Sequence, residues 1–220
     1  MSTSAPPTTP DHATDPAAAP NRTATTENFP VASWLLRRDA RPKVLAFYRF
    51  VRTADDVADH PAMTADEKLR QLDAMDAALD DPATARPDTA AIHASGVGTA
   101  EARRMLSAFR QDATRARYDD WAELRDYCSR SAAPVGRMLL RVCDSDTDEA
   151  RAASDALCEA LQILNHLQDL GPDRDKLGRI YLPIPWMEAA GGEHGFFGDA
   201  AARRPVLDAA LDRVEESLDR

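Results

Sequence analysis

Apolar residues recur every three or four positions along most of the chain, and this periodicity constrains the fold more than any other feature. One such stripe follows Pro42 and consists of Val44, Phe47, Val51 and Ala54. Because an α-helix has about 3.6 residues per turn, residues at this spacing share one helix face and pack against other helices. The sequence therefore predicts an all-α protein built as a helical bundle.

Residues typical of helix starts divide the chain into separate helices. Pro42 suits the first turn of a helix, where its missing amide hydrogen is not needed. The run Thr64-Ala65-Asp66-Glu67 has the pattern of a capping box, and Thr99 is expected to cap a further helix. Pro205 is expected to open the last helix.

Proline and glycine also mark places where a helix bends or ends. Pro134 and Gly136 are expected to bend the helix predicted over residues 120–143. The helix predicted over residues 148–170 is expected to end at Gly171-Pro172. Strand patterns are almost absent, and only Ile180-Tyr181-Leu182 is expected to pair with another segment.

Composition excludes several classes of function. The chain has 220 residues and a net charge of −10, which disfavours a broad basic surface for nucleic acid. It contains only 9 glycines and no glycine-rich phosphate loop. Its 3 cysteines include no Cys-x-x-Cys pair, so we expect neither a zinc site nor a disulfide framework.

The chain is expected to consist of a tail and one helical domain. Residues 1–26 are rich in Thr, Ala and Pro and are expected to be disordered. The domain is expected to cover residues 27–220; because no stop signal ends its last helix, the fold is expected to be incomplete at its C-terminus. No membrane span or signal peptide is apparent, so we expect a cytoplasmic protein, and peripheral membrane contact stays open.

The first group of candidate functional residues lies on one helix stripe. Tyr48, Arg52, Asp55 and Asp59 are spaced by four, three and four residues, so they share a face beside the apolar one. Two such carboxylates can neighbour Mg²⁺ ions whose other ligands come from substrate phosphates, and an arginine beside them can bind the same phosphates. The alternative is an intrahelical ladder of Arg–Asp salt bridges on an exposed face.

A second group lies near the end of the helix over residues 148–170. Gln162, Asn165 and Asp169 share a face, Asp173 follows four residues later, and the rest of the helix is expected to be buried through Leu161, Ile163 and Leu164. A pair of hydrogen-bonded core amides is the alternative. If the two helices faced each other, their acids would form a four-carboxylate site inside the bundle. His166 is expected to point away from the amide face and to be structural.

These segments together resemble the squalene/phytoene synthase family, the head-to-head branch of the isoprenoid synthase fold, over residues 27–220. Tyr48 to Asp59 is similar to the first Asp-rich motif of that family, and Asp126-Tyr127-Cys128 with residues 131–136 to its tyrosine-bearing helix. Gln162 to Asp173 with residues 178–183 is similar to the second Asp-rich motif and the sequence that closes it. The match is closer to a hopanoid-pathway, HpnC-like subfamily through residues 27–33, 109–112 and 165–169.

The resemblance implies a role for each candidate residue. Mg²⁺ ions that bridge the substrate diphosphate would be held by Asp55, Asp59, Asp169 and Asp173. The diphosphate itself would be contacted by Arg52, and the substrate by Ser33. The walls near the reacting carbons would be formed by Tyr48, Tyr127, Gln162 and Asn165. The cavity would be closed by Arg179 and Tyr181, and two prenyl tails would lie among apolar residues.

The implied reaction ionises presqualene diphosphate, rearranges the cation and quenches it with water to hydroxysqualene. Condensation of two farnesyl diphosphates remains an alternative, as does a non-catalytic member that acts as a binding protein. Two departures bear on the site: Gln168 stands where many members have arginine, and Pro172 interrupts the helix before Asp173. The resemblance also implies other hopanoid-pathway enzymes as partners.

Overall fold

The computed structural model describes residues 36–81 and 86–219, and within them the chain forms helices and no strand. The prediction of an all-α protein is therefore confirmed. The predicted tail over residues 1–26 and the segment that contains Ser33 lie outside the described residues. The helices are α1 (Ala40–Ala58), α2 (Ala65–Ala78), α3 (Pro87–Ser95), α4 (Ala100–Thr114), α5 (Trp121–Ser131), α6 (Ala133–Val142), α7 (Asp148–Gln168), α8 (Leu170–Leu177), α9 (Ile184–Ala189), α10 (Gly192–Gly198) and α11 (Ala200–Leu218).

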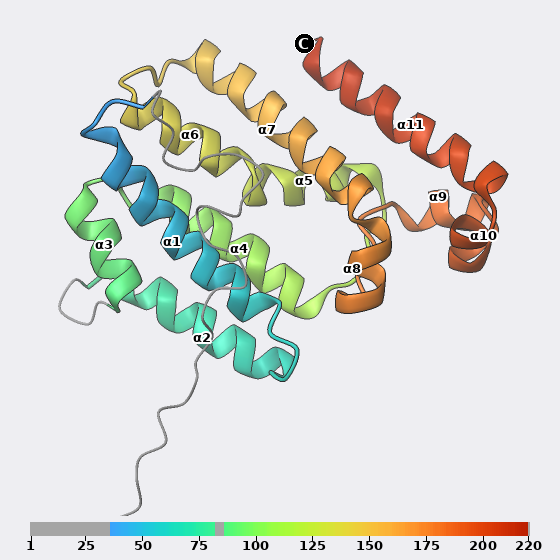
Figure 1. Cartoon of the computed structure of the whole chain (residues 1–220), viewed down its shortest axis with the longest axis horizontal. Coiled ribbons are helices and arrows are strands. Elements are labelled where there is room, and N and C mark those ends of the chain that lie inside the picture. Colours follow the sequence, from blue (N-terminus) through green and yellow to red (C-terminus); the bar gives the residue numbers. More distant parts are fainter. Residues whose placement is uncertain (1–35, 82–85, 220) are drawn as a thin grey trace, which may run out of the picture.

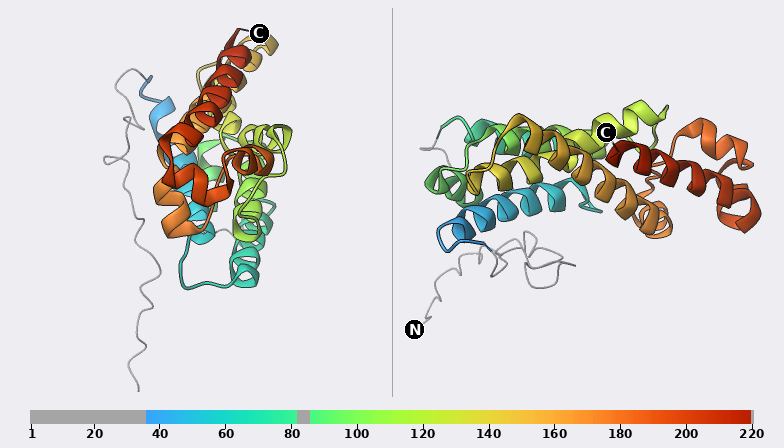
Figure 2. Two further views of the ribbon diagram at one scale, coloured as in Figure 1. Left: turned by 90° about the vertical axis from the view of Figure 1, so that its right-hand side faces the viewer. Right: turned by 90° about the horizontal axis from the view of Figure 1, so that it is seen from above.

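The helices form an elongated bundle. Helices α1–α4 and α6 gather at one end, whereas α8–α11 lie toward the other (Figure 1). Helix α7 packs on α6 and α5 and also on α11, so it joins the two ends (Figure 2). None of the helices in the described residues combines the length and apolar character needed to cross a membrane.

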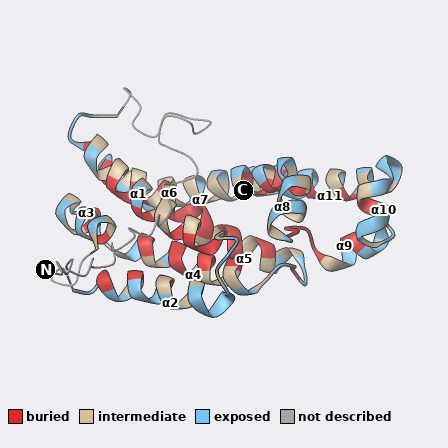
Figure 3. Cartoon of the chain, turned by 60° about the horizontal axis from the view of Figure 1, so that its bottom comes forward, coloured by how far each residue is buried: buried red, intermediate tan, exposed pale blue. Residues whose placement is uncertain are grey.

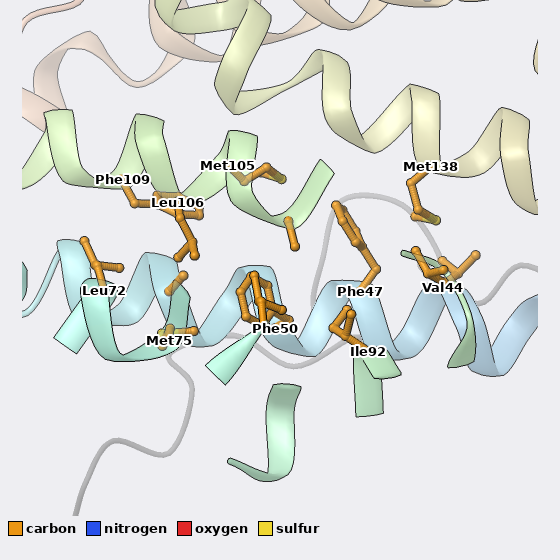
Figure 4. Close-up of a cluster of buried hydrophobic side chains, with 14 of the residues drawn as sticks. Val44, Phe47, Phe50, Leu72, Met75, Ile92, Met105, Leu106, Phe109 and Met138 are labelled. Atoms are coloured by element: carbon orange, nitrogen blue, oxygen red, sulfur yellow. The ribbon is translucent and has the colours of Figure 1, made fainter. Parts of the chain in front are cut away.

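The largest hydrophobic core lies around the inward face of α1. Phe47 and Phe50 are almost fully buried among side chains from α2, α3, α4 and α6 (Figure 4). Val44 and Ala54 are also buried, and Val51 packs at the edge of the same core, as the apolar stripe predicted. Buried residues follow the centre of the bundle, while the outer surface of α2 is exposed (Figure 3). The core therefore fixes which face of α1 is left for polar residues.

The predicted helix starts are confirmed in part. Thr64 and Glu67 form both bonds of the capping box at the start of α2. Thr99 does precede α4, but its side chain makes no capping bond. The prediction for Pro205 was wrong: α11 already starts at Ala200, capped by the Asp199 side chain, and Pro205 lies inside the helix.

The helix predicted over residues 120–143 is interrupted between α5 and α6, at Ala132, instead of bending at Pro134 and Gly136. Ala132 leaves the helical region, with φ −122° and ψ −47°, and Pro134 lies in the first turn of α6, where a missing amide hydrogen is tolerated. Gly136 has a different role. A Cβ at this position would meet the side chains of Ser154 and Cys158 on α7, so glycine permits the close contact between α6 and α7.

The second acidic segment spans a junction of two helices. Helix α7 ends at Gln168, and α8 begins at Leu170. The prediction that the helix ends at Gly171-Pro172 was therefore wrong, because both residues lie within α8. Pro172 falls in the first turn of α8, where no amide hydrogen is needed. The amide of Asp173 still donates to the carbonyl of Asp169, 2.8 Å away, which keeps the two acids one helical turn apart.

The extended segment after α8 pairs with the loop between α4 and α5, as expected for Ile180-Tyr181-Leu182. The amide of Ile180 donates to the carbonyl of Ala116 at 3.0 Å, and the amide of Ile184 to that of Tyr118 at 2.8 Å. This pairing brings Arg179 and Tyr181 into the middle of the bundle, where both are buried.

Candidate active site

The first acidic helix presents its polar face beside the main core. Arg52 contacts Asp55 through Nη1 at 3.0 Å and Asp56 through Nη2 at 2.6 Å. These are the intrahelical ion pairs of the salt-bridge alternative, but they do not lie on an open surface, because the Arg52 side chain is only 18% exposed. Tyr48 lies one turn earlier and packs at the edge of the core. Asp59 has a partner from elsewhere in the chain.

Arg179 connects the end of α1 with the end of α4. Its Nη1 donates to Oδ1 of Asp59 at 2.6 Å. Its Nη2 donates to the carbonyls of Ala58 at 3.2 Å and Asp112 at 3.0 Å. Lys68 on α2 is a further cation near this pair: burial and the Arg179 charge lower its pKa, while Asp59 opposes that effect. A buried guanidinium thus holds the second acid of the first motif in place.

Asp112 is a buried carboxylate that the sequence did not single out as a site residue. Its Oδ2 accepts a hydrogen bond from the Tyr127 hydroxyl at 2.8 Å, and its Oδ1 accepts one from the Tyr181 hydroxyl at 3.3 Å. Burial raises the pKa of Asp112 to about 6, although the charge of Arg179 opposes the rise. The only sequence signal for it was the segment over residues 109–112, which carried part of the family resemblance.

His166 packs with Tyr127 and Tyr181, and the prediction that it points away from the amide face of its helix was wrong. Its ring stacks on that of Tyr181 with centroids 3.7 Å apart, and its Nε2 lies 3.1 Å from Nε2 of Gln162. Burial lowers the pKa of His166 to about 3, so the ring is neutral at pH 7. The helical spacing of four residues between Gln162 and His166 was the signal that could have placed them together.

The second acidic segment is more open than the first. Asn165 and Asp169 are exposed, and Gln162 and Asp173 are partly buried. Ile163 is buried as predicted, but the prediction for Leu161 was wrong: it is 51% exposed, because this face of α7 is not covered by the described residues.

The two acidic segments come close enough for the charges of Asp59 and Asp173 to interact. Burial raises the pKa of Asp55 to about 7, and the Asp59 carboxylate adds to the rise. Burial raises the pKa of Asp173 to about 6, with further contributions from Asp169 and from Asp59 on the other segment. Within the described residues, however, no three acidic, histidine or cysteine side chains converge tightly enough to form a metal-ligand cluster. The arrangement concentrates negative charge without closing into a protein-only cage.

Comparison with known proteins gives a consistent result. The sequence profile of the squalene/phytoene synthase family matches residues 22–220. A hydroxysqualene synthase of Rhodopseudomonas palustris is 47% identical over 171 residues, which cover 76% of this chain and 58% of the relative. A hydroxysqualene synthase of Sinorhizobium fredii is 42% identical over 185 residues, covering 82% of this chain and 63% of the relative. The chain thus spans about three fifths of the length of these relatives.

A solved structure shows the same fold. The squalene synthase HpnC from Alicyclobacillus acidocaldarius superposes with a TM-score of 0.75 at 32% sequence identity. The match covers 90% of this chain and 78% of that protein. The order and packing of the helices therefore agree with a known structure over most of the chain.

Proposed function

Because the chain belongs to the squalene/phytoene synthase family, we propose that it ionises a prenyl diphosphate with the help of Mg²⁺, and that its reaction converts presqualene diphosphate to hydroxysqualene. The observation that supports this proposal is the charge interaction between Asp59 of the first acidic segment and Asp173 of the second, with arginines beside the first segment. The relatives named hydroxysqualene synthase favour this reaction over others of the family.

The residues fit a magnesium site completed by the substrate. The proposed ligands are Asp55, Asp59, Asp169 and Asp173, which offer the hard carboxylate oxygens that Mg²⁺ prefers. The raised pKa values of Asp55 and Asp173 reflect carboxylates that burial and their acidic neighbours penalise, and a bound cation would relieve that penalty. Since the acids do not form a closed cluster, diphosphate oxygens and water would supply the remaining ligands. Bound Mg²⁺ supplies Lewis-acid neutralisation of the charge on the departing diphosphate.

The arginines of this end of the bundle would bind and orient the diphosphate. Arg52 is proposed to contact it directly, because its guanidinium lies between Asp55 and Asp56 at the rim of the acidic region. Arg179 is proposed to close the site, since it is anchored to Asp59 and to two carbonyls and is itself buried. Ser33, outside the described residues, is a further proposed substrate contact.

The aromatic and amide residues would surround the cation left after ionisation. Tyr48, Tyr127, Gln162 and Asn165 are proposed to lie near the reacting carbons, with Tyr181 closing this region. A dry surrounding that admits water only at the last step suits a carbocation quenched to an alcohol. Leu161 and Leu157 lie one and two turns before Asn165 on α7 and are half exposed, so they offer apolar surface for a prenyl tail.

We also propose that the protein works in the cytoplasm with a lipid-like substrate that it meets at a membrane surface. Enzymes of hopanoid synthesis that produce presqualene diphosphate or consume hydroxysqualene would be its partners in the pathway.

The test is an assay of the 220-residue chain with Mg²⁺ and presqualene diphosphate, and separately with farnesyl diphosphate, with products identified by mass spectrometry. Asp55→Asn should lower product formation at least about 100-fold, because metal assistance is worth several kcal/mol. Asp208→Asn is the matched control, since Asp208 and Asp212 have the same spacing on the exposed surface of α11. Product from farnesyl diphosphate alone would point to the full condensation. A folded chain without product from either substrate would contradict the proposal for these 220 residues.

A further inference from the structure

Asp112 occupies a central place among the proposed site residues without being one of the proposed metal ligands. It lies on α4, is 8% exposed, and each of its carboxylate oxygens accepts a hydrogen bond from a different tyrosine. Tyr127 comes from α5, and Tyr181 from the extended segment after α8. One buried acid thus links three parts of the chain that are distant in sequence.

The contacts of Asp112 extend to both acidic segments. Its backbone carbonyl accepts from Arg179, which in turn binds Asp59 on the first segment. The ring of Tyr181 stacks on His166, which contacts Gln162 on the helix that leads to the second segment. The side chain of Asp112 therefore hydrogen-bonds both tyrosines, its backbone carbonyl hydrogen-bonds Arg179, and its charge also interacts with that of Arg179.

Burying a carboxylate costs desolvation free energy that its hydrogen bonds must offset. An asparagine or an apolar residue would avoid the loss of solvation at this position. Only an ionised carboxylate, however, accepts at both oxygens, which obliges both phenols to donate. With their hydrogens directed at Asp112, the oxygens of Tyr127 and Tyr181 become more electron-rich.

We propose that Asp112 is a positioning residue that fixes the orientation and hydrogen-bond role of the Tyr127 and Tyr181 hydroxyls for cation stabilisation. This inference rests on the proposed function, in which the two tyrosines contact the substrate. Oriented dipoles that meet developing charge without reorganising are an effective form of catalysis. The electron-rich rings would add to the attraction for a cation.

The same surroundings keep both phenols protonated. Burial, followed by the charge of Asp112, raises the pKa of Tyr127 well above its usual value, and burial and Asp112 do the same for Tyr181. A phenolate would capture a carbocation and alkylate the protein, whereas a neutral phenol is a much weaker nucleophile. Burial and Asp112 together keep the hydroxyls protonated, and Asp112 sets their direction.

The first measurement requires no activity. The Raman doublet of tyrosine reports how strongly a phenol donates, and the chain has 4 tyrosines. Asp112→Asn should move the doublet toward weaker donation, and the combined Tyr127→Phe and Tyr181→Phe variant should remove the affected component. Glu101→Gln is the matched control, because Glu101 is an equally buried acid on α4 that pairs with Arg141 instead of a tyrosine. An unchanged doublet in Asp112→Asn would overturn the inference.

The second measurement separates kcat from KM with presqualene diphosphate. Asp112→Asn should lower kcat about 10- to 100-fold, the loss expected for a charged hydrogen bond, and leave KM within about twofold. In the Tyr127→Phe, Tyr181→Phe background the same substitution should have no further effect on kcat, because it acts through the absent hydroxyls. An additive loss would show that Asp112 acts by another route.

The two readouts distinguish failure of this inference from failure of the proposed function. If the wild-type chain makes no product, the proposed function fails, and the Raman comparison alone decides the role of Asp112. If Asp112→Asn does not fold, Tyr127→Phe and Tyr181→Phe replace it, and a wild-type kcat in both would contradict the inference.

Discussion

The two acidic segments have the same spacing but different surroundings. Asp55 lies on α1 and Asp59 directly follows its last residue. The opposite face of α1 is buried in the main core, and each of the two acids contacts an arginine. Asp169 and Asp173 span the junction of α7 and α8, and Asp169 is exposed. The first segment is thus held by direct ion pairs, whereas the charge of Asp173 is offset in part by the nearby charges of Arg179 and Lys176.

The two acidic segments therefore differ in how firmly the protein holds their carboxylates in place. A pair fixed by arginines presents its carboxylates in a set direction before substrate arrives. Because the pKa is raised at both Asp55 and Asp173, a bound cation would stabilise a carboxylate in each pair.

The inward face of α1 should dominate stability. Phe50→Ala should lower the free energy of unfolding by about 3–5 kcal/mol, because Phe50 is fully buried and its loss leaves a cavity. Leu161→Ala on the exposed face of α7 should lower it by less than about 1 kcal/mol. Urea denaturation followed by circular dichroism measures both. Equal losses would mean that the second segment is as firmly packed as the first.

Mg²⁺ together with inorganic diphosphate should stabilise the folded chain through both acidic segments. At a ligand concentration 100 times the dissociation constant, the gain would be about 2.7 kcal/mol. Asp169→Asn should remove most of this gain, whereas Asp208→Asn should not alter it. Thermal unfolding with and without the ligands measures the effect. A full gain in Asp169→Asn would exclude that residue from the metal site.

The helix that carries the second segment should depend on a glycine. Gly136→Ala should destabilise the protein by about 1–3 kcal/mol, because the added Cβ meets Ser154 and Cys158 on α7. Gly171→Ala is the matched control, since no atom lies within 4 Å of a Cβ at that position. Its stability should stay the same or rise slightly through better helix propensity. A neutral Gly136→Ala would show that α6 and α7 separate readily.

Asp173 should make stability depend on pH in the absence of metal. Its folded pKa of about 6 lies above its unfolded value of about 3.9, so the folded state binds more protons between these values. Its contribution to stability is therefore fully present below about pH 4 and is lost as the pH rises through 6. At pH 7 Asp173→Asn should raise stability by about 1 kcal/mol, less than the full shift implies because the side chain is partly solvated. Added Mg²⁺ should reverse the order of the two proteins, and a pH-independent difference would refute the argument.

Much of the helical framework could be predicted from local sequence. The apolar stripe on α1 identified its buried face, and the pattern at Thr64 to Glu67 identified the start of α2. Both depend on residues within a few positions of each other, where helix geometry decides which groups meet. The errors at Pro205 and at Gly171-Pro172 both concern where a helix begins. Helix α11 starts earlier than Pro205, at the Asp199 cap, and Pro172 falls in the first turn of a new helix, where proline is tolerated.

The sequence by itself determined the all-α class, the buried face of α1 and the identity of the acidic residues, because each follows from composition and helical spacing. Only the tertiary structure decided that Arg179 binds Asp59, 120 residues earlier, and that Asp112 joins Tyr127 and Tyr181. Periodicity tells which face of a helix is apolar, but not which polar groups of different helices will meet once those faces are buried. That choice depends on how helices from distant parts of the chain pack together.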